Sequence, residues 1–288
     1  DVVHDARRDG VARGRRLRDQ GALTPELVLI LGELLAKQGE DAAAKRLFSE
    51  LVEFAPDSLV SRKLLGDIFL RHGWHEDAYR QYALLMQTAE APWVALRMAR
   101  AAAGTGRTDE ALRLLRRVAT GEGRPGVDDP RRWARLHVAG LLAELLTSDQ
   151  AGKELPKDKL ESELRAQGLF ESATTWELLL WDDLDAQLLM TDRKPDDGRK
   201  PTASELGAEQ VDASSTGLFA LQTSNPLGEL FVRHRGLVPN RDVKWRRITI
   251  RWDGATFAIE QREGTIAAKV ARADMQPVGA PPEQPASP

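Results

Sequence analysis

The sequence predicts a multidomain protein in which an N-terminal α-helical solenoid is followed by a C-terminal antiparallel β-sandwich. Between residues 24 and 118, glycine, alanine and bulky side chains recur with offsets of 34 and then 33 residues. A fixed period of this length is typical of stacked helical repeats. After Gly168 the apolar residues change from helical spacing to the alternation typical of β-strands.

The repeat is clearest in its first two copies. Thr24 can cap the first helix, and Pro25 suits its first position. The positions that recur are occupied by Gly32, Gly39, Ala44 and Phe48, then by Gly66, Gly73, Ala78 and Tyr82. This pattern resembles the tetratricopeptide repeat, in which a small residue lets helix A of each copy approach helix B. The resemblance implies a helical scaffold that binds a protein or peptide.

The resemblance also implies a groove lined by the A helices. Carried over to this chain, the partner-binding residues are Leu29, Glu33, Lys37, Lys63, Asp67, Arg71, Trp93, Leu96 and Arg100. Lys63, Asp67 and Arg71 are four residues apart and share one stripe of a helix. Trp93 and Leu96 would add apolar area beside these charges, as at the centre of an interface. A peptide or a partner helix suits such a mixed surface.

Changes in composition and periodicity give the predicted domain boundaries. The predicted segments are a lead-in helix over 1–23, a helical array with capping helices over 24–168, a β-sandwich domain over 169–276 and a disordered tail or linker over 277–288. The chain begins at Asp1 without a methionine. We therefore expect a mature protein or a piece of a longer one.

Alternating apolar residues predict about seven short strands in the second domain. The candidates span 174–181, 184–190, 217–222, 229–235, 244–252, 256–260 and 265–271. Asp253-Gly254 lies between two of these runs and predicts a hairpin. The polar segment 193–210 carries two prolines and predicts a mobile loop.

An acidic turn follows the first predicted strand. Asp182, Asp183 and Asp185 could donate oxygen ligands to calcium, or they could form a polar turn. The run Trp181, Asp183, Leu184, Asp185 also resembles the small β-domains encoded beside bacterial alpha-2-macroglobulin homologues. That resemblance implies a cell-envelope protein that works in an assembly and has no catalysis of its own.

The overall composition does not favour several functional classes. The net charge of −3 gives no electrostatic argument for nucleic acid, and no apolar run is long enough for membrane insertion. The absence of cysteine excludes disulfides and thiolate metal sites. No motif of a hydrolase elbow, zinc protease or dinucleotide site occurs, so we predict no catalytic residues, no enzyme activity and no cofactor, with calcium as the one candidate.

The favoured hypothesis is a non-enzymatic scaffold whose groove binds a protein or peptide, with the periplasm or cell envelope as its compartment and the cytoplasm as the alternative. A rival hypothesis is a secreted or periplasmic β-sandwich that binds calcium or a glycan, with the helices as a spacer. A third is a hydrolase that uses Asp182, Asp183 and Asp185, although no nucleophile or base accompanies them in the sequence.

Overall fold

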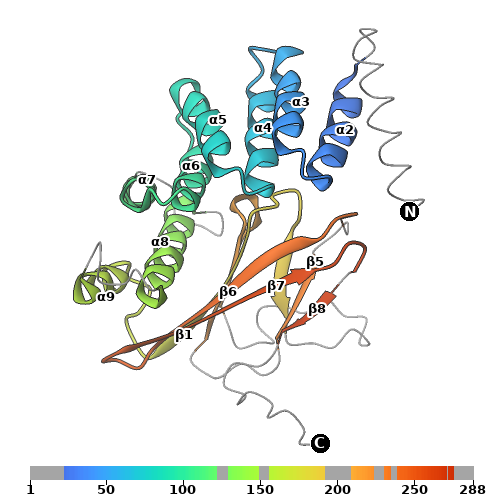
Figure 1. The fold of residues 1–288 in the computed structure, drawn as a ribbon. Coiled ribbons are helices and arrows are strands. Elements are labelled where there is room, and N and C mark those ends of the chain that lie inside the picture. The colour runs from blue at the N-terminus through green and yellow to red at the C-terminus, as the bar shows by residue number, and fades with distance from the viewer. Residues whose placement is uncertain are drawn as a thin grey trace, which may run out of the picture. The chain divides into compact units, whose positions relative to one another are not determined.

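The computed structural model describes residues 23–121, 129–148, 156–191, 209–223, 230–234, 239–270 and 272–275. Within these ranges the chain forms eight α-helices followed by eight β-strands (Figure 1). This order confirms the prediction of a helical N-terminal part and an antiparallel β part. The predicted helix before residue 23, most of the predicted loop 193–210 and the predicted tail 277–288 lie outside the described residues.

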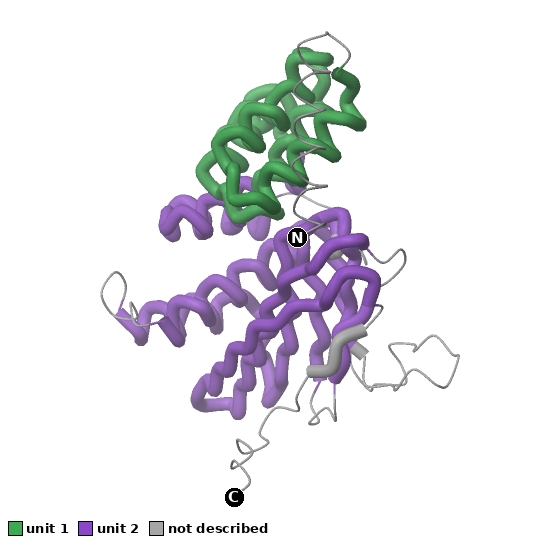
Figure 2. The backbone as a smooth tube through the Cα atoms, turned by 45° about the vertical axis from the view of Figure 1, so that its right-hand side comes forward, with its two compact units in different colours: residues 1–90 green, residues 91–288 purple. Residues whose placement is uncertain are grey.

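The chain divides into two compact units, residues 1–90 and residues 91–288 (Figure 2). Unit 1 holds the first two helix pairs. Unit 2 holds the remaining helices together with all described strands. The boundary predicted near Gly168 therefore falls inside unit 2.

Unit 1 consists of two helical hairpins, α2 with α3 and α4 with α5. Their bounds are Pro25–Lys37 for α2, Asp41–Glu53 for α3, Leu59–Arg71 for α4 and His75–Thr88 for α5. Gly39 and Gly73 link the helices of each pair with φ of 77° and 73°. This left-handed conformation lets the chain reverse after a helix, and glycine adopts it at little steric cost.

Within each hairpin, a glycine of the first helix faces an aromatic ring of the second. Gly32 lies against the ring of Phe48, and a Cβ atom built on Gly66 would lie 2.9 Å from Cε1 of Tyr82. Both rings are fully buried. The repeat period of the sequence therefore reflects a repeated close contact between helix A and helix B.

Unit 2 begins with four more helices. Their bounds are Pro92–Gly104 for α6, Thr108–Thr120 for α7, Pro130–Thr147 for α8 and Lys157–Ala166 for α9. The helix α8 packs on α7 and also on the sheet, where Gly140 approaches the side chains of Leu178, Leu180 and Ile248. Among the described residues, no helix combines the length and apolar character needed to cross a bilayer.

The strands of unit 2 form two antiparallel sheets. One has the order β3-β4-β1-β6-β7 and the other the order β2-β5-β8. The bounds are Thr174–Trp181 for β1, Leu188–Thr191 for β2, Glu209–Ala213 for β3, Leu218–Thr223 for β4, Leu230–His234 for β5, Val243–Trp252 for β6, Phe257–Ile266 for β7 and Arg272–Met275 for β8. Buried side chains from both sheets share one core cluster, which includes Leu179, Met190 and Val232. Closure into a sandwich stays a prediction.

Three local features of the strands can be compared with the sequence. The hairpin at Asp253-Gly254 is confirmed, because β6 pairs with β7 on either side of it and Asp253 accepts hydrogen bonds from the following backbone. The strands predicted over 256–260 and 265–271 instead form one strand, β7, up to Ile266. Gly264 lies within that strand, where the ring of Trp245 occupies the space that a side chain would need. The strands β3 and β8 were missed, and the strand predicted over 184–190 begins only at Leu188.

We expect Gly66→Leu to destabilise unit 1, because the new side chain would collide with the Tyr82 ring. Overpacking of this kind typically costs ~1–3 kcal/mol. The free energy of unfolding, measured by denaturant titration, checks this. Ala42→Leu, at an exposed site on α3, adds a similar volume and should change little. Equal stability of Gly66→Leu and the parent would show that this contact does not constrain the fold.

Candidate functional site

The candidate site in unit 1 lies on the A helices, α2 and α4. Each begins at a hydroxyl cap: Thr24 accepts from the amide of Leu27 at 3.4 Å, and Ser58 accepts from the amide of Ser61 at 3.2 Å. Such caps satisfy amides that a helix start leaves unpaired. The caps and the glycine crossings together fix the direction in which the side chains of these A helices project.

A three-residue network joins the two A helices. The guanidinium of Arg71 donates to Glu33, and Nε2 of His72 lies 3.2 Å from Oε1 of Glu33. Burial by itself raises the pKa of Glu33, but the hydrogen bond from His72 and the charge of Arg71 together lower it to about 2. Glu33 is therefore ionised at neutral pH and holds the C-terminal end of α4 against α2.

A second network lies on the same stripe of α4. Lys63 pairs with Asp67 at 2.7 Å, and the hydroxyl of Tyr82 donates to the other oxygen of Asp67 at 2.7 Å. Asp67 and Tyr82 are buried, whereas the Lys63 side chain is partly exposed. The stripe predicted from Lys63, Asp67 and Arg71 thus exists, but Asp67 also helps to join helix A to helix B.

Two apolar side chains accompany these charges. Val60 on α4 is 74% exposed and Ile30 on α2 is 58% exposed. Val60 lies three residues before Lys63 on α4, and Ile30 lies three residues before Glu33 on α2. The sequence analysis missed Ile30 as a member of this surface and His72 as a partner of Glu33. We call Ile30, Glu33, Val60, Lys63 and Arg71 the A-helix surface.

Two further predicted groove residues lie on α2. Leu29 is half-buried, and Lys37 is exposed at the last helical position. Both are in unit 1 with the A-helix surface.

The three groove residues predicted from the third copy belong to unit 2. Leu96 is buried, and Nε of Arg100 donates to Asp182 at 2.6 Å. The ring of Trp93 lies 5.0 Å from the guanidinium of Arg97, which donates in turn to the carbonyl of Ser215 at 2.9 Å. Ser215 belongs to the short helix η3 (Ser214–Thr216). This part of helix α6 therefore contacts the β part of its own unit.

The acidic turn after β1 is paired with arginines. Asp183 accepts from Arg241 at 2.5 and 2.7 Å, and Asp185 pairs with Arg241 at 3.0 Å. Asp182 pairs with Arg100. The described part of the chain holds no group of three metal-ligating side chains. Calcium binding at Asp182, Asp183 and Asp185 stays a prediction, and it would require these arginines to be displaced.

Charged groups also line the contact of α6 and α8 with the sheet. Burial raises the pKa of Glu144, which pairs with Arg246 at 2.8 Å. Burial and the charge of Arg100 lower the pKa of His137 to about 3. Nε2 of His137 lies 2.9 Å from the Thr216 hydroxyl, which itself donates to a backbone carbonyl. His137 is therefore a neutral donor that links α8 to η3.

Sequence comparison supports the repeat. Residues 26–58 match the family model described as Tetratricopeptide repeat, which covers α2 and α3. No curated protein matches the chain.

Structural comparison finds several chains named MamA. MamA from Desulfovibrio magneticus RS-1 has 12% sequence identity and a TM-score of 0.33, covering 58% of this chain and 97% of that chain. MamA MSR-1 has 19% identity and a TM-score of 0.32, covering 58% of this chain and 99% of that chain. MamA AMB-1 has 14% identity and a TM-score of 0.31, covering 56% and 90%. These TM-scores are too low to support an inference about function.

We expect Glu33→Gln to lower the melting temperature at about pH 7. The decrease should become smaller as the pH falls. Because the folded-state pKa is about 2 and the ordinary value is 4.5, ionised Glu33 stabilises the fold above the ordinary value. That stabilisation is lost as the pH falls towards the folded value. Calorimetry of parent and variant across this range checks the expectation. Glu53→Gln, at an exposed site on α3, is the control. If the difference in melting temperature between the parent and Glu33→Gln did not change with pH, the expectation would be wrong.

We expect unit 2 to lose stability below the ordinary pKa of His137. The folded pKa of about 3 lies below 6.5, so the neutral form contributes stability above 6.5 that decreases as the pH falls towards 3. His137→Gln keeps a hydrogen-bond donor without this titration, and its stability should depend less on pH. Hydrogen exchange of the α8 amides measures the effect in unit 2. The same pH dependence in parent and variant would exclude this role.

Proposed function

We propose that the protein is a non-enzymatic scaffold that binds a protein or peptide partner on the A-helix surface of unit 1. The observation that carries this proposal is the pairing of exposed Val60 and Ile30 with charges on the same helix stripes. Apolar anchors beside fixed charges are typical of interface centres. The tetratricopeptide match over residues 26–58 supports the same class of function.

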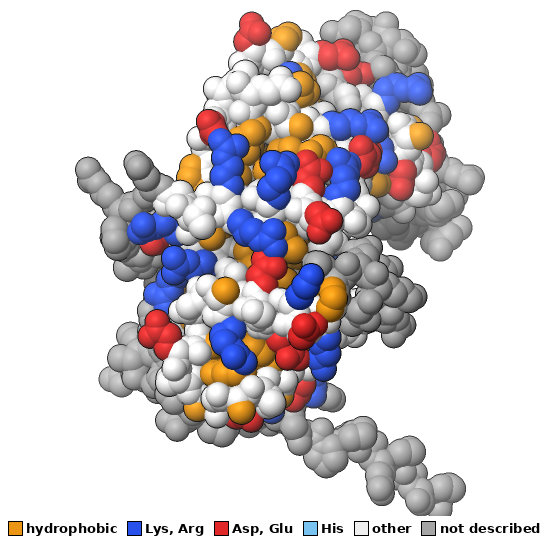
Figure 3. All heavy atoms as spheres, turned by 90° about the vertical axis from the view of Figure 1, so that its left-hand side faces the viewer, with side chains coloured by type: hydrophobic (Ala, Val, Ile, Leu, Met, Phe, Trp, Pro, Cys, Tyr) orange, Lys and Arg blue, Asp and Glu red, His pale blue; other side chains and the backbone are white. Residues whose placement is uncertain are grey.

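The charge distribution favours a protein partner over nucleic acid. The net charge of the chain is −3. On the molecular face in Figure 3, basic and acidic side chains are interspersed, with apolar side chains between them. Nucleic-acid binding depends on a continuous basic surface that neutralises phosphates. A peptide or helix with its own mixture of apolar and charged residues suits such a mixed surface better than a nucleic acid does.

The ion pairs preorganise side chains of the A-helix surface before a partner binds. Glu33 fixes Arg71 before any partner arrives, so less side-chain entropy is lost in complex formation. Lys63 is 40% exposed and can exchange Asp67 for an acidic group of a partner. Asp67 would keep its hydrogen bond from Tyr82. The partner segment should therefore carry an apolar anchor for Val60 and an acidic group for Lys63.

The cell envelope is the compartment that we propose for this scaffold. Its support is the resemblance of Trp181, Asp183, Leu184 and Asp185 to the β-domains encoded beside alpha-2-macroglobulin homologues. Fractionation of source cells into periplasm and cytoplasm tests the compartment independently of the binding surface.

Site-specific photo-crosslinking tests the proposed surface. A photoreactive phenylalanine analogue replaces Val60 in one variant and Leu84 in another. Leu84 is 43% exposed on helix B α5 and provides the matched control. We expect the Val60 position to crosslink a discrete partner, and Lys63→Glu in the same chain to reduce the yield because the proposed acidic contact would become repulsive.

Two outcomes would contradict the proposal. Equal crosslinking from Val60 and Leu84 would show non-specific collision. A yield from Val60 that Lys63→Glu leaves unchanged would exclude the proposed charged contact. Thermal melting of each variant shows that folding is retained.

A further inference from the structure

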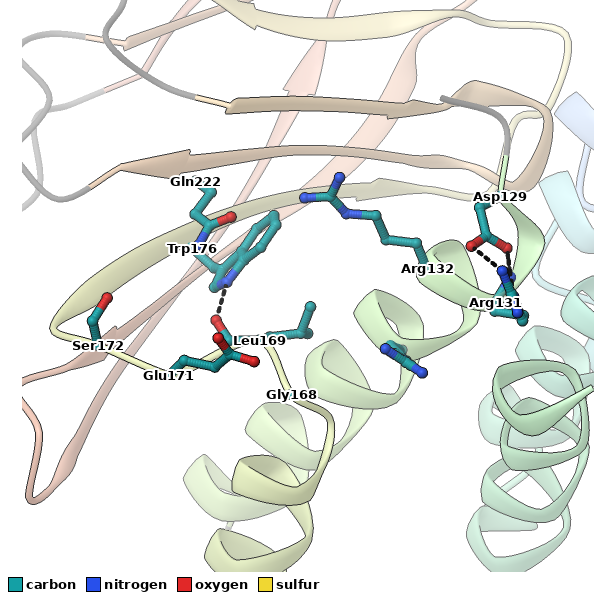
Figure 4. A pocket seen from close by; sticks show the side chains of 10 residues that line it. Asp129, Arg131, Arg132, Gly168, Leu169, Glu171, Ser172, Trp176 and Gln222 are labelled. Atoms are coloured by element: carbon teal, nitrogen blue, oxygen red, sulfur yellow. Dashed lines mark hydrogen bonds and ion pairs between the residues drawn. The ribbon is translucent and has the colours of Figure 1, made fainter. Parts of the chain in front are cut away.

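Unit 2 has cavities of the size that ligand sites in proteins have. One lies at the start of α8 beside Trp176 and has a volume of about 470 Å³ (Figure 4). There Asp129 pairs with Arg131, and the guanidinium of Arg132 lies 5.8 Å from the centre of the Trp176 ring. Another cavity, of about 500 Å³, is lined by residues of α6, the end of β1, the start of β6 and the end of β7. We call this one the β6–β7 cavity, and its charged side chains differ in being partly unpaired.

The strand register places the charged lining of the β6–β7 cavity on one face of the sheet. Arg246 lies opposite Glu263, and Lys244 lies opposite Thr265. On the other side of β6, Arg246 lies opposite Leu180, which α8 contacts. Because side chains alternate along a strand, these five share the face on which α8 packs. Lys244 and Glu263 are diagonal neighbours, and such residues lie about 7–8 Å apart.

A guanidinium from the helices also lines this cavity. Arg100 of α6 is one of its lining residues, and the Arg100 side chain is 15% exposed. Its Nε donates to Asp182 at 2.6 Å, which is the one hydrogen bond that this guanidinium makes with the described residues. The two terminal nitrogens therefore keep their donors. Because donors that are largely buried are normally bonded, these nitrogens favour an acceptor from outside the chain.

Two lining side chains of opposite charge have no partner in the described part of the chain. Lys244 and Glu263 are both exposed, and neither makes a hydrogen bond or an ion pair there. Arg246, by contrast, pairs with Glu144 at 2.8 Å. The β6–β7 cavity therefore presents one cation and one anion, together with the terminal nitrogens of Arg100. A ligand that carries both a negative and a positive group can contact all of them at once.

We propose that the β6–β7 cavity binds a small zwitterion of the α-amino acid class. The carboxylate of the ligand accepts hydrogen bonds from the terminal nitrogens of Arg100 and from Lys244, and its ammonium group donates to Glu263. Hydrogen bonds between ionised groups are about twice as strong as neutral ones. Every residue used here belongs to unit 2, so the inference is independent of the A-helix surface.

Titration of the ¹⁵N-labelled full chain with L-alanine, followed by two-dimensional NMR, tests this proposal. The amides of Gly264 and Thr265 report on the cavity, because both residues line it. Propionate lacks the ammonium group of L-alanine, and ethylamine lacks its carboxylate, so the two are matched comparison ligands. We expect saturable shifts with L-alanine. Each comparison ligand should bind about tenfold more weakly, because it loses one charge-assisted contact.

Single substitutions assign the two ends of the ligand. Glu263→Gln should weaken the binding of L-alanine and ethylamine and leave that of propionate unchanged. Lys244→Gln should weaken the binding of L-alanine and propionate and leave that of ethylamine unchanged. Both side chains are exposed, so a loss of binding cannot be attributed to unfolding. Arg100→Lys keeps the charge without the planar fork and should also weaken L-alanine binding; its melting curve shows whether the fold is retained.

A matched variant controls for overall charge. Lys159→Gln removes an exposed lysine from α9, which does not line the cavity, and it should bind L-alanine as the parent does. Equal weakening by Lys159→Gln and Lys244→Gln would mean non-specific charge attraction and would overturn the proposal. Propionate binding as tightly as L-alanine would indicate a simple carboxylate site instead. Shifts that rise linearly with L-alanine and never saturate would show that no site exists.

Discussion

The contact between a glycine of helix A and an aromatic ring of helix B is the constraint on which unit 1 depends. At Gly32 and Gly66 the ring of Phe48 or Tyr82 occupies the space that a side chain would need. Between the two hairpins, Glu33 of α2 contacts Arg71 and His72 at the end of α4. The same Tyr82 that packs on Gly66 also orients Asp67 through its hydroxyl. Packing and the charged surface are therefore parts of one arrangement.

Unit 2 uses a related solution with different partners. Gly140 lets α8 lie close to Leu178, Leu180 and Ile248 of the sheet, as the repeat glycines let helices approach each other. The surrounding charges then fix the helices on the sheet, with Arg100 on Asp182 and Glu144 on Arg246. These half-buried pairs link the helices to the β part at defined residues.

Local patterns in the sequence predicted much of the fold. The glycine period gave the helical hairpins, and Asp253-Gly254 gave the turn between β6 and β7. Contacts between distant residues could not be predicted, because a single sequence does not record them. Arg100 meets Asp182 across 82 residues, so the helix A register alone suggested an open groove at Leu96 and Arg100. The cavity beside Trp176 likewise combines segments that no local motif joins.

The attachment of α6 to the β part bears on how such an array can change length during evolution. Arg97 and Arg100 tie this repeat to η3 and to the acidic turn, and α7 packs on α8. A duplicated repeat inserted between Glu90 and Ala91 would leave the internal contacts of both units intact. A duplication between α7 and α8 would separate helices that now pack together. Growth of the array is therefore easier before the third helix pair than after it.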